Sequence, residues 1–540
     1  MRTIDKSAWL LAALSGGLQV LIFPTPNLYW LCWVALTPLL VAVFRARPPE
    51  LQMSGAKGAQ SLLPATAGQA FLLGWLSGAI TYAGSCYWVM YTMHVYGGLA
   101  TPVALGVQLL FCFWVGAQTG LFTLLLALVA GKAAKSRPQI AYALVAAPFL
   151  WVAVELSRSR IVGLPWDLLG NAQVDNIPLT RLATVTGVYG LSFEIMLVNT
   201  AFAAAILNRQ RWKPLLGAAV FAAAVLQLSA FLQPPPAPAS LSATLVQPNF
   251  SLDENWTPQH FRQALDAMLQ KSLAPDAGQG QDHDPANLIV WPESPAPFWI
   301  SERGLRTTAS QLAIKAHADV IVGVLAVDES LIKPGQTDPE PLLNAAALIA
   351  PDGNWTARYD KIHLVPFGEY VPFKSLLGFA HQLTREVGNF VPGWKRTVFD
   401  MGSYKIGPFI CYESIFPNEV RQFALHGAEV FVNISDDAWY GRTGAPGQHL
   451  NMARMRAIEN NRWLLLDTNN GITAVVDPVG RVVEQAPRDV FTALSVRFGT
   501  VSSTTFYTRH GDWFAWLCVI IGVLSVSYSV INSYRRRASG

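Results

Sequence analysis

The sequence is poor in charge and in cysteine. Only 14% of its 540 residues are Asp, Glu, Lys or Arg, whereas average soluble domains carry roughly 25%. This shortage makes an ordinary cytosolic enzyme a poor fit, and the accompanying apolar content excludes a disordered chain. The five cysteines have no paired spacing, which argues against a disulfide framework or a metal site. The net charge of only +4 implies no nucleic-acid partner.

Long apolar runs are what the sequence has in excess. Hydrophobic residues make up 52% of it, and a membrane-spanning helix needs about 20 of them in succession. This rule predicts a polytopic α-helical membrane bundle of about eight spans, near residues 8–24, 28–46, 68–90, 100–130, 139–157, 186–207, 214–232 and 513–533. We therefore expect seven spans in region 1–233, a soluble domain at 240–510, and the last span with a cytoplasmic tail at 511–540.

The charges beside the spans predict their orientation. Eight spans place both termini on one side, and Lys and Arg gather there, at Arg2, Lys6, Arg45, Arg47, Lys57, Lys132, Lys135, Arg137, Arg209, Arg211, Lys213 and 535–537. On the other side, loops 25–27 and 91–99 contain neither, although 158–185 has three Arg residues. The positive-inside rule then puts both termini in the cytoplasm and the soluble domain outside it. A signal peptide is the alternative for the first segment, but no small-residue cleavage site follows it.

The region 240–510 alternates predicted strands with predicted helices, which indicates an α/β domain with a buried sheet. The strands are expected at 241–247, 287–291, 318–326, 344–350, 404–411, 428–434, 463–468 and 472–477. Helices are expected at 257–273, 302–316, 417–426 and 446–461. In such sheets, polar residues at strand ends are the candidates for chemistry.

Two of these strand-end candidates are a carboxylate and an ammonium. Glu293 follows the strand 287–291, and a partly buried carboxylate there can act as a general base. Lys361 lies among aromatic and apolar neighbours, where an ammonium can stabilise a developing oxyanion. Glu369 is a further candidate for support or catalysis. Taken singly, each of the three is also compatible with an ordinary loop or surface side chain.

The third strand end carries a thiol. Cys411 follows an apolar strand and precedes a polar turn that leads into a helix, so the pattern predicts a strand-to-helix elbow that exposes a nucleophile. It is the only cysteine in region 240–510. The other four lie in predicted spans, where cysteine is normally a small apolar filler. An inert buried thiol remains the alternative for Cys411 considered alone.

A Glu after a strand, a central Lys and a Cys in a Cys-Tyr-Glu turn, in this order, resemble the Glu-Lys-Cys triad of the nitrilase superfamily. With its membrane spans, the sequence resembles the apolipoprotein N-acyltransferase family over nearly its whole length. The matching stretches include 163–166 (GLPW), 187–193 (GVYGLSF), 247–249 (QPN), 366–372 (PFGEYVP), 437–440 (DAWY), 448–449 (QH), 453–459 (ARMRAIE) and 468–471 (TNNG). The resemblance implies a nitrilase-like αββα sandwich for region 240–510.

The resemblance also implies a two-step acyl transfer. Cys411 would take an acyl chain from a phospholipid, with phosphatidylethanolamine as the expected donor, and hold it as a thioester. The acceptor would be the N-terminal amine of a diacylglyceryl-cysteine on an apolipoprotein. Glu293 would act as the base and Lys361 as an oxyanion donor, and no cofactor would be needed. The implied location is the bacterial inner membrane, multi-pass, with the catalytic domain on the periplasmic side.

Further site residues follow from the resemblance by position. Glu369, Tyr412 and Glu413 would support the triad, and Glu413 would orient Lys361 or the amine unless it is only a helix cap. The substrate-binding residues would be Trp256, Trp439 and Asn344, with ordinary packing as the alternative. The apolar loop 369–380 is expected to dip into the membrane interface or to cover the site.

Two other functions remain open at this point. A membrane-tethered nitrilase-like amidase would use the same triad on a small soluble amide or nitrile. A transporter or receptor with a non-catalytic ligand-binding domain would keep the spans but would have no use for Cys411.

Overall fold

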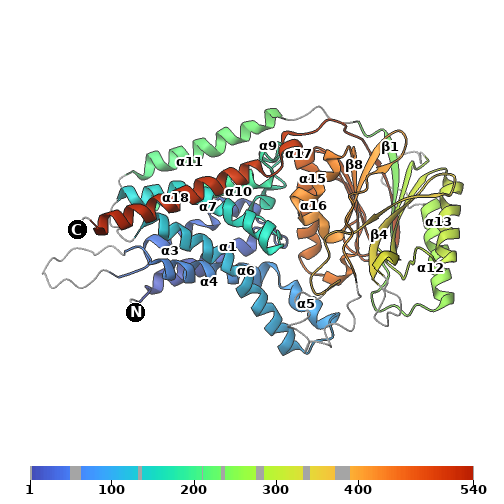
Figure 1. Cartoon of the computed structure of the whole chain (residues 1–540), viewed down its shortest axis with the longest axis horizontal. Coiled ribbons are helices and arrows are strands. Elements are labelled where there is room, and N and C mark those ends of the chain that lie inside the picture. The colour runs from blue at the N-terminus through green and yellow to red at the C-terminus, as the bar shows by residue number, and fades with distance from the viewer. Residues whose placement is uncertain are drawn as a thin grey trace. The chain divides into compact units, whose positions relative to one another are not determined.

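The computed structural model describes residues 3–48, 63–131, 137–208, 211–232, 238–274, 285–331, 341–370 and 390–538. The chain divides into two compact units, which are taken separately below (Figure 1). Residues 1–233, 443–448 and 510–540 form the helical unit, and residues 234–442 and 449–509 form the sandwich unit. Loop residues 371–380, for which a role at the membrane interface is expected, lie outside the described residues.

The helical unit is built from apolar helices. Within the described residues, four are long and apolar enough to cross a membrane, namely Thr101–Ala130, Gln139–Val162, Val188–Leu207 and Trp513–Arg535. They coincide with four of the eight expected spans, and the other four spans stay a prediction. The helices are α1 (Lys6–Leu21), α2 (Cys32–Ala35), α3 (Thr37–Phe44), α4 (Ala67–Ser85), α5 (Trp88–Val95), α6 (Thr101–Ala130), α7 (Arg137–Ser157), α8 (Ile177–Thr180), α9 (Ala183–Thr186), α10 (Val188–Leu207), α11 (Trp212–Leu226) and α18 (Trp513–Ala538).

Two of the expected spans are interrupted in the structure. Segment 68–90 is divided between α4 and α5, and segment 28–46 is divided between α2 and α3. At the second break, the side-chain oxygen of Asn199 accepts hydrogen bonds from the backbone N–H groups of Leu36 and Thr37, both at 2.9 Å. A helix can be broken in apolar surroundings only where its freed backbone groups find such partners. Asn199 lies on α10, so periodicity along 28–46 could not predict this break.

The sandwich unit contains two sheets of six strands each in the described part of the chain. The first has the order β12-β1-β2-β3-β4-β5 and the second the order β11-β10-β9-β8-β7-β6. The strands are β1 (Leu241–Gln247), β2 (Leu288–Trp291), β3 (Asp319–Val327), β4 (Leu342–Ile349), β5 (Trp355–Asp360), β6 (Phe399–Asp400), β7 (Lys405–Ile410), β8 (Val430–Ser435), β9 (Trp463–Thr468), β10 (Ala474–Val476), β11 (Val482–Gln485) and β12 (Thr492–Phe498).

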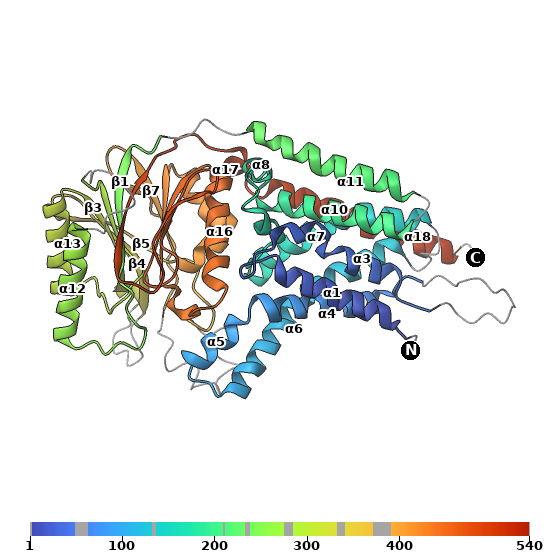
Figure 2. The ribbon, with the colours of Figure 1, turned by 180° about the vertical axis from the view of Figure 1, so that it is seen from behind.

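Helices cover the outer faces of both sheets (Figures 1 and 2). Helices α12 (Pro258–Leu273) and α13 (Arg303–Ala316) lie on the first sheet, and α15 (Pro417–Leu425) and α16 (Ala445–Asn460) lie on the second. Leu265 and Leu312 on the first pair of helices pack against Ile289 and Val322 of the sheet, and all four are buried. The short helix α17 (Phe506–His510) precedes the last apolar helix. This αββα layering agrees with the expected nitrilase-like fold.

Parallel pairing places the strand ends that carry the candidate residues. Strands β1, β2 and β3 pair in parallel in one sheet, as do β7, β8 and β9 in the other. The carboxyl ends of parallel strands meet at one edge of a sheet, where ligands of α/β proteins usually bind. Each of the eight expected strands is present, but β5, β6, β11 and β12 were not predicted. Strand β5 matters most, because Lys361 directly follows it.

Candidate active site

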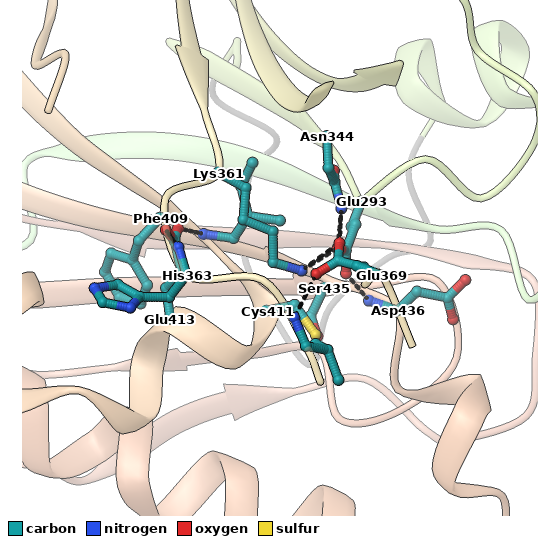
Figure 3. A network of polar contacts seen from close by, with 12 residues as sticks. Glu293, Asn344, Lys361, His363, Glu369, Phe409, Cys411, Glu413, Ser435 and Asp436 are labelled. Carbon is teal, nitrogen blue, oxygen red and sulfur yellow. Dashed lines mark hydrogen bonds and ion pairs between the residues drawn. The ribbon is translucent and has the colours of Figure 1, made fainter. Parts of the chain in front are cut away.

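The first feature of the site is a buried lysine between two carboxylates. The Lys361 ammonium donates to Oε1 of Glu293 at 2.9 Å and to Oε1 of Glu369 at 3.0 Å (Figure 3). The Asn344 amide on β4 donates to the same two oxygens, at 2.7 and 2.8 Å. The backbone N–H of Asp436 donates to Oε2 of Glu293 at 2.9 Å. The four side chains are at most 9% exposed, so the cluster forms one preorganised unit.

The charges of this cluster depend on one another. Burial acts to lower the pKa of Lys361, but the negative charges of Glu293 and Glu369 outweigh it, so that the pKa lies well above its ordinary value. Lys361 therefore stays protonated. Two of its three N–H groups donate to the carboxylates. Among the described residues the third has no acceptor, so it can serve a further one.

The second feature is the elbow that carries the thiol. Strand β7 ends at Ile410, and a short 3-10 helix, η6 (Cys411–Ile415), begins at the cysteine itself. Cys411 has a φ of 49°, a left-handed conformation that costs a non-glycine residue about 1–2 kcal/mol. Such strain at a strand-to-helix turn is typical of a nucleophile that must face away from its own strand. Figure 3 shows Cys411 beside the Glu293–Lys361–Glu369 cluster.

The surroundings of Cys411 favour its protonated form at rest. Burial raises the pKa of the thiol well above its ordinary value, and the charge of Glu293 raises it further, while Lys361 acts in the opposite direction. A thiol in this state needs a base to remove its proton when it attacks. Among the nearby charges, that of Glu293 has the largest effect on the pKa of the thiol.

The raised pKa predicts how Cys411 reacts with iodoacetamide. Only the thiolate reacts, so we expect the alkylation rate to keep rising through about pH 9–10, beyond the ordinary cysteine pKa of about 8.5. The rate is measured by mass spectrometry of the Cys411 peptide in folded protein, with Cys411→Ser as the background. A plateau below about pH 8 would contradict this charge arrangement.

The third feature is Glu413, which joins the lysine loop to the elbow. Its Oε1 accepts from the Tyr359 hydroxyl at 2.7 Å and from the backbone N–H of Ile362 at 2.7 Å. Its Oε2 accepts from the backbone N–H of Ile410 at 2.7 Å. Glu413 therefore caps the turn at Cys411 and also holds the backbone beside Lys361. A role in orienting the Lys361 ammonium or the acceptor amine stays a prediction. Burial raises its pKa, and these hydrogen bonds act to lower it.

Replacing Glu413 with glutamine is expected to destabilise the protein. In glutamine, an NH2 group replaces one of the two carboxylate oxygens and would face the N–H groups that this oxygen accepts from. A lost buried hydrogen bond to a charged group costs about 1.5–3 kcal/mol. We expect the melting temperature to fall by about 5–10 °C. Differential scanning fluorimetry in detergent measures it, and Glu484→Gln on the exposed strand β11 is the control. An unchanged melting temperature for E413Q would show that the carboxylate is dispensable.

The remaining expected site residues take different places. Tyr412 is 5% exposed and packs against Phe416 at 5.3 Å between ring centroids. Trp439 is 44% exposed and follows Asp437 closely in the chain. Trp256 is half-buried and packs on Phe250 at 5.3 Å beside the first-sheet core, which favours the packing alternative. Asn344 donates to Glu293 and Glu369, and its expected role in substrate binding stays a prediction.

Sequence reasoning missed a buried pair beside the thiol. Nδ1 of His449 lies 3.0 Å from Oδ1 of Asp437, and its Nε2 lies 3.0 Å from the backbone oxygen of Cys411. Asp436 was missed as well, and it holds Glu293 through its N–H. Burial, with Glu293, raises the pKa of Asp436 to about 8. The available signal was the polar run that directly follows the strand 428–434.

The sandwich unit belongs to the class of carbon-nitrogen hydrolase domains, because residues 242–497 match that family. Residues 15–201 match the apolipoprotein N-acyltransferase N-terminal domain. The apolipoprotein N-acyltransferase of Geobacter metallireducens is 34% identical over 528 residues, covering 96% of this chain and 94% of that protein. That of Azotobacter vinelandii is 31% identical over 559 residues, covering 100% and 98%. The chain therefore belongs to the apolipoprotein N-acyltransferase family, which confirms the resemblance.

Solved structures also include similar chains. A mutant of the amidase from Nesterenkonia sp. AN1 is 20% identical, with a TM-score of 0.34, and the match covers 49% of this chain and 94% of that one.

Proposed function

We propose that this protein transfers an acyl chain from a membrane phospholipid to the N-terminal amine of diacylglyceryl-cysteine on apolipoproteins, through a thioester on Cys411. The donor is phosphatidylethanolamine. The observation that carries the proposal is the buried lysine between two carboxylates beside a cysteine on a strained elbow. Relatives of nearly equal length that are named apolipoprotein N-acyltransferases support the substrate class. They disfavour a small-amide amidase and a non-catalytic binding protein.

The first half-reaction forms the thioester. Glu293 takes the proton of the Cys411 thiol, and the sulfur attacks the ester carbonyl carbon of the phospholipid. The resulting oxyanion accepts hydrogen bonds from the third N–H of Lys361 and from backbone N–H groups near Cys411. One such donor is typically worth about 3 kcal/mol. As the tetrahedral intermediate collapses, the ester C–O bond breaks. The lysophospholipid leaves with the proton from Glu293.

The second half-reaction transfers the chain to nitrogen. The neutral amine of the acceptor attacks the thioester carbonyl, and Glu293 accepts a proton from the amine. The C–S bond breaks, and the Cys411 sulfur recovers its proton from Glu293. The product is an amide, and the enzyme returns to its starting state. No cofactor is needed in this scheme, because the thioester itself stores the acyl group.

The helical unit keeps this chemistry at the bilayer. Burying one methylene is worth about 0.8 kcal/mol, so a long acyl chain does not leave the membrane freely. We propose eight spans in the bacterial inner membrane, both termini in the cytoplasm, and the sandwich unit in the periplasm. The four long apolar helices support membrane insertion. Flanking Lys and Arg residues support the orientation.

Thioester capture tests the proposal. Full-length protein in detergent is mixed with phosphatidylethanolamine that carries a radiolabelled acyl chain, in the absence of acceptor. We expect a hydroxylamine-sensitive label on the wild type and on Cys518→Ser, and none on Cys411→Ser. Adding a diacylglyceryl-cysteine lipopeptide should then move the label to the peptide. Equal label on Cys411→Ser would overturn the thioester mechanism, and label that never reaches the lipopeptide would overturn the acceptor.

A further inference from the structure

The mechanism above does not use the buried pair of His449 and Asp437. Each of the two side chains is 1% exposed. His449 lies on α16, and Asp437 follows β8. Asp437 is held in turn by the hydroxyl of Ser435, which donates to its Oδ1 at 2.8 Å. The imidazole thus has a fixed partner on one side and the carbonyl of the nucleophile on the other.

The contacts of the ring define its charge. A carboxylate oxygen and a backbone carbonyl oxygen can only accept hydrogen bonds. Nε2 of His449 must therefore donate to the carbonyl. With Asp437 as a carboxylate, Nδ1 carries a proton as well, which makes the ring an imidazolium. Burial acts to lower the pKa of His449, but the charge and hydrogen bond of Asp437 outweigh it, so the pKa is raised. The carbonyl oxygen of Cys411 accordingly receives a charge-assisted hydrogen bond.

That hydrogen bond also determines where the next N–H points. The peptide group between Cys411 and Tyr412 is planar and trans, so its C=O and N–H point in opposite directions. Holding the carbonyl at His449 directs the N–H of Tyr412 to the other side of the peptide. The imidazolium that donates to the carbonyl oxygen also polarises this peptide group and makes its N–H a stronger donor.

We propose that Asp437 and His449 are a positioning pair, which fixes and polarises the Cys411–Tyr412 peptide so that its N–H binds the oxyanion together with Lys361. This role rests on the proposed thioester chemistry of Cys411. The pair touches neither acyl group nor amine. It acts through the backbone of the nucleophile and keeps that backbone in its left-handed conformation.

Two reactions of the same thiol test the pair. Thioester formation from phospholipid passes through an oxyanion, whereas alkylation by iodoacetamide is a displacement that needs no oxyanion donor. For His449→Leu we expect thioester formation to fall about 100-fold, the usual effect of one oxyanion donor. Alkylation of Cys411 should stay close to the wild-type rate. His449→Gln, which retains an N–H donor, should recover at least half of the loss on a logarithmic scale.

Controls keep the outcome clear. His426→Leu replaces an exposed histidine and should leave both rates unchanged, and Cys411→Ser supplies the alkylation background. If His449→Leu does not fold, Asp437→Asn serves instead, because it removes the charge that holds the imidazolium. That charge also acts to raise the pKa of the Cys411 thiol, so alkylation should not fall in this variant. A parallel fall in both rates, or no fall in thioester formation, overturns the positioning role. Wild-type label that persists in Cys411→Ser would instead refute the proposed function.

Discussion

Replacing Lys361 with methionine is expected to slow thioester formation by at least about 1000-fold, because it removes an oxyanion donor and disables the base together. The ammonium supplies the positive charge between the oxygens of Glu293 and Glu369 in a buried site, and the Asn344 amide beside it is neutral. Without it, the two carboxylates repel each other, and one of them takes up a proton. Removing one partner of a buried ion pair costs about 3–5 kcal/mol, so the melting temperature should fall by about 10 °C.

Two further lysine variants separate charge from geometry. Lys361→Arg keeps the positive charge but replaces a compact ammonium by a planar fork, so it should recover stability more than activity. Lys405→Met removes an exposed lysine that pairs with Asp400 at 3.7 Å, and both measurements should remain at wild-type values. The readouts are the initial rate of labelling from phospholipid and the melting temperature in detergent. A Lys361→Met protein that still labels at a tenth of the wild-type rate would remove Lys361 from the mechanism.

Glu293→Gln is expected to reduce thioester formation by about 1000-fold with a smaller change in stability, because a general base is worth roughly 100- to 10,000-fold. An amide cannot take the thiol proton, although its oxygen still accepts from Lys361 and Asn344. The charge of Lys361 remains compensated by Glu369. Activity and stability should therefore separate in this variant, whereas they fall together in Lys361→Met.

The second carboxylate supplies the matched comparison. Glu369→Gln removes the same charge from the same ammonium, but Glu369 is proposed to support the site. Oε2 of Glu369 accepts from the backbone N–H of Val365 at 2.8 Å, which ties it to its own loop. We expect a loss of thioester formation at least about tenfold smaller than for Glu293→Gln. Equal losses in the two variants would mean that charge balance around Lys361, and not a particular base, limits the reaction.

The strands and the elbow were predictable because their signals are local. Runs such as 241–247 and 463–468 are rich in apolar and β-branched residues and match β1 and β9 in full. Strand β5 has no continuous apolar run, because apolar residues alternate with polar ones along it and its side chains are mostly half-buried or exposed. Such alternation is the pattern of a half-buried strand, but apolar runs alone do not reveal it. The interrupted segments 28–46 and 68–90 were predicted as continuous spans because hydropathy averages over a break.

The supporting contacts were not predictable from neighbouring residues. Asn344 on β4 reaches Glu293 and Glu369, which lie 51 and 25 residues away along the chain. The same holds for His449, which meets the carbonyl of Cys411 across 38 residues. The resemblance implied a substrate-binding role for Asn344 and gave His449 no role, so neither set of contacts was expected.

Through the family resemblance, the sequence implied the αββα layering. By itself it determined the membrane character, an α/β domain with a buried sheet, and Glu293, Lys361 and Cys411 as candidates. These follow from hydrophobic length, from strand-helix alternation and from the order of three motifs, all of which can be read along the chain. Only the tertiary structure decided that Lys361 is shared by two carboxylates and that Glu413 joins two loops. It alone also gave Cys411 a charged partner in His449. The physical reason is that parallel strands bring distant segments to one sheet edge, and burial there makes each hydrogen bond and charge depend on its neighbours.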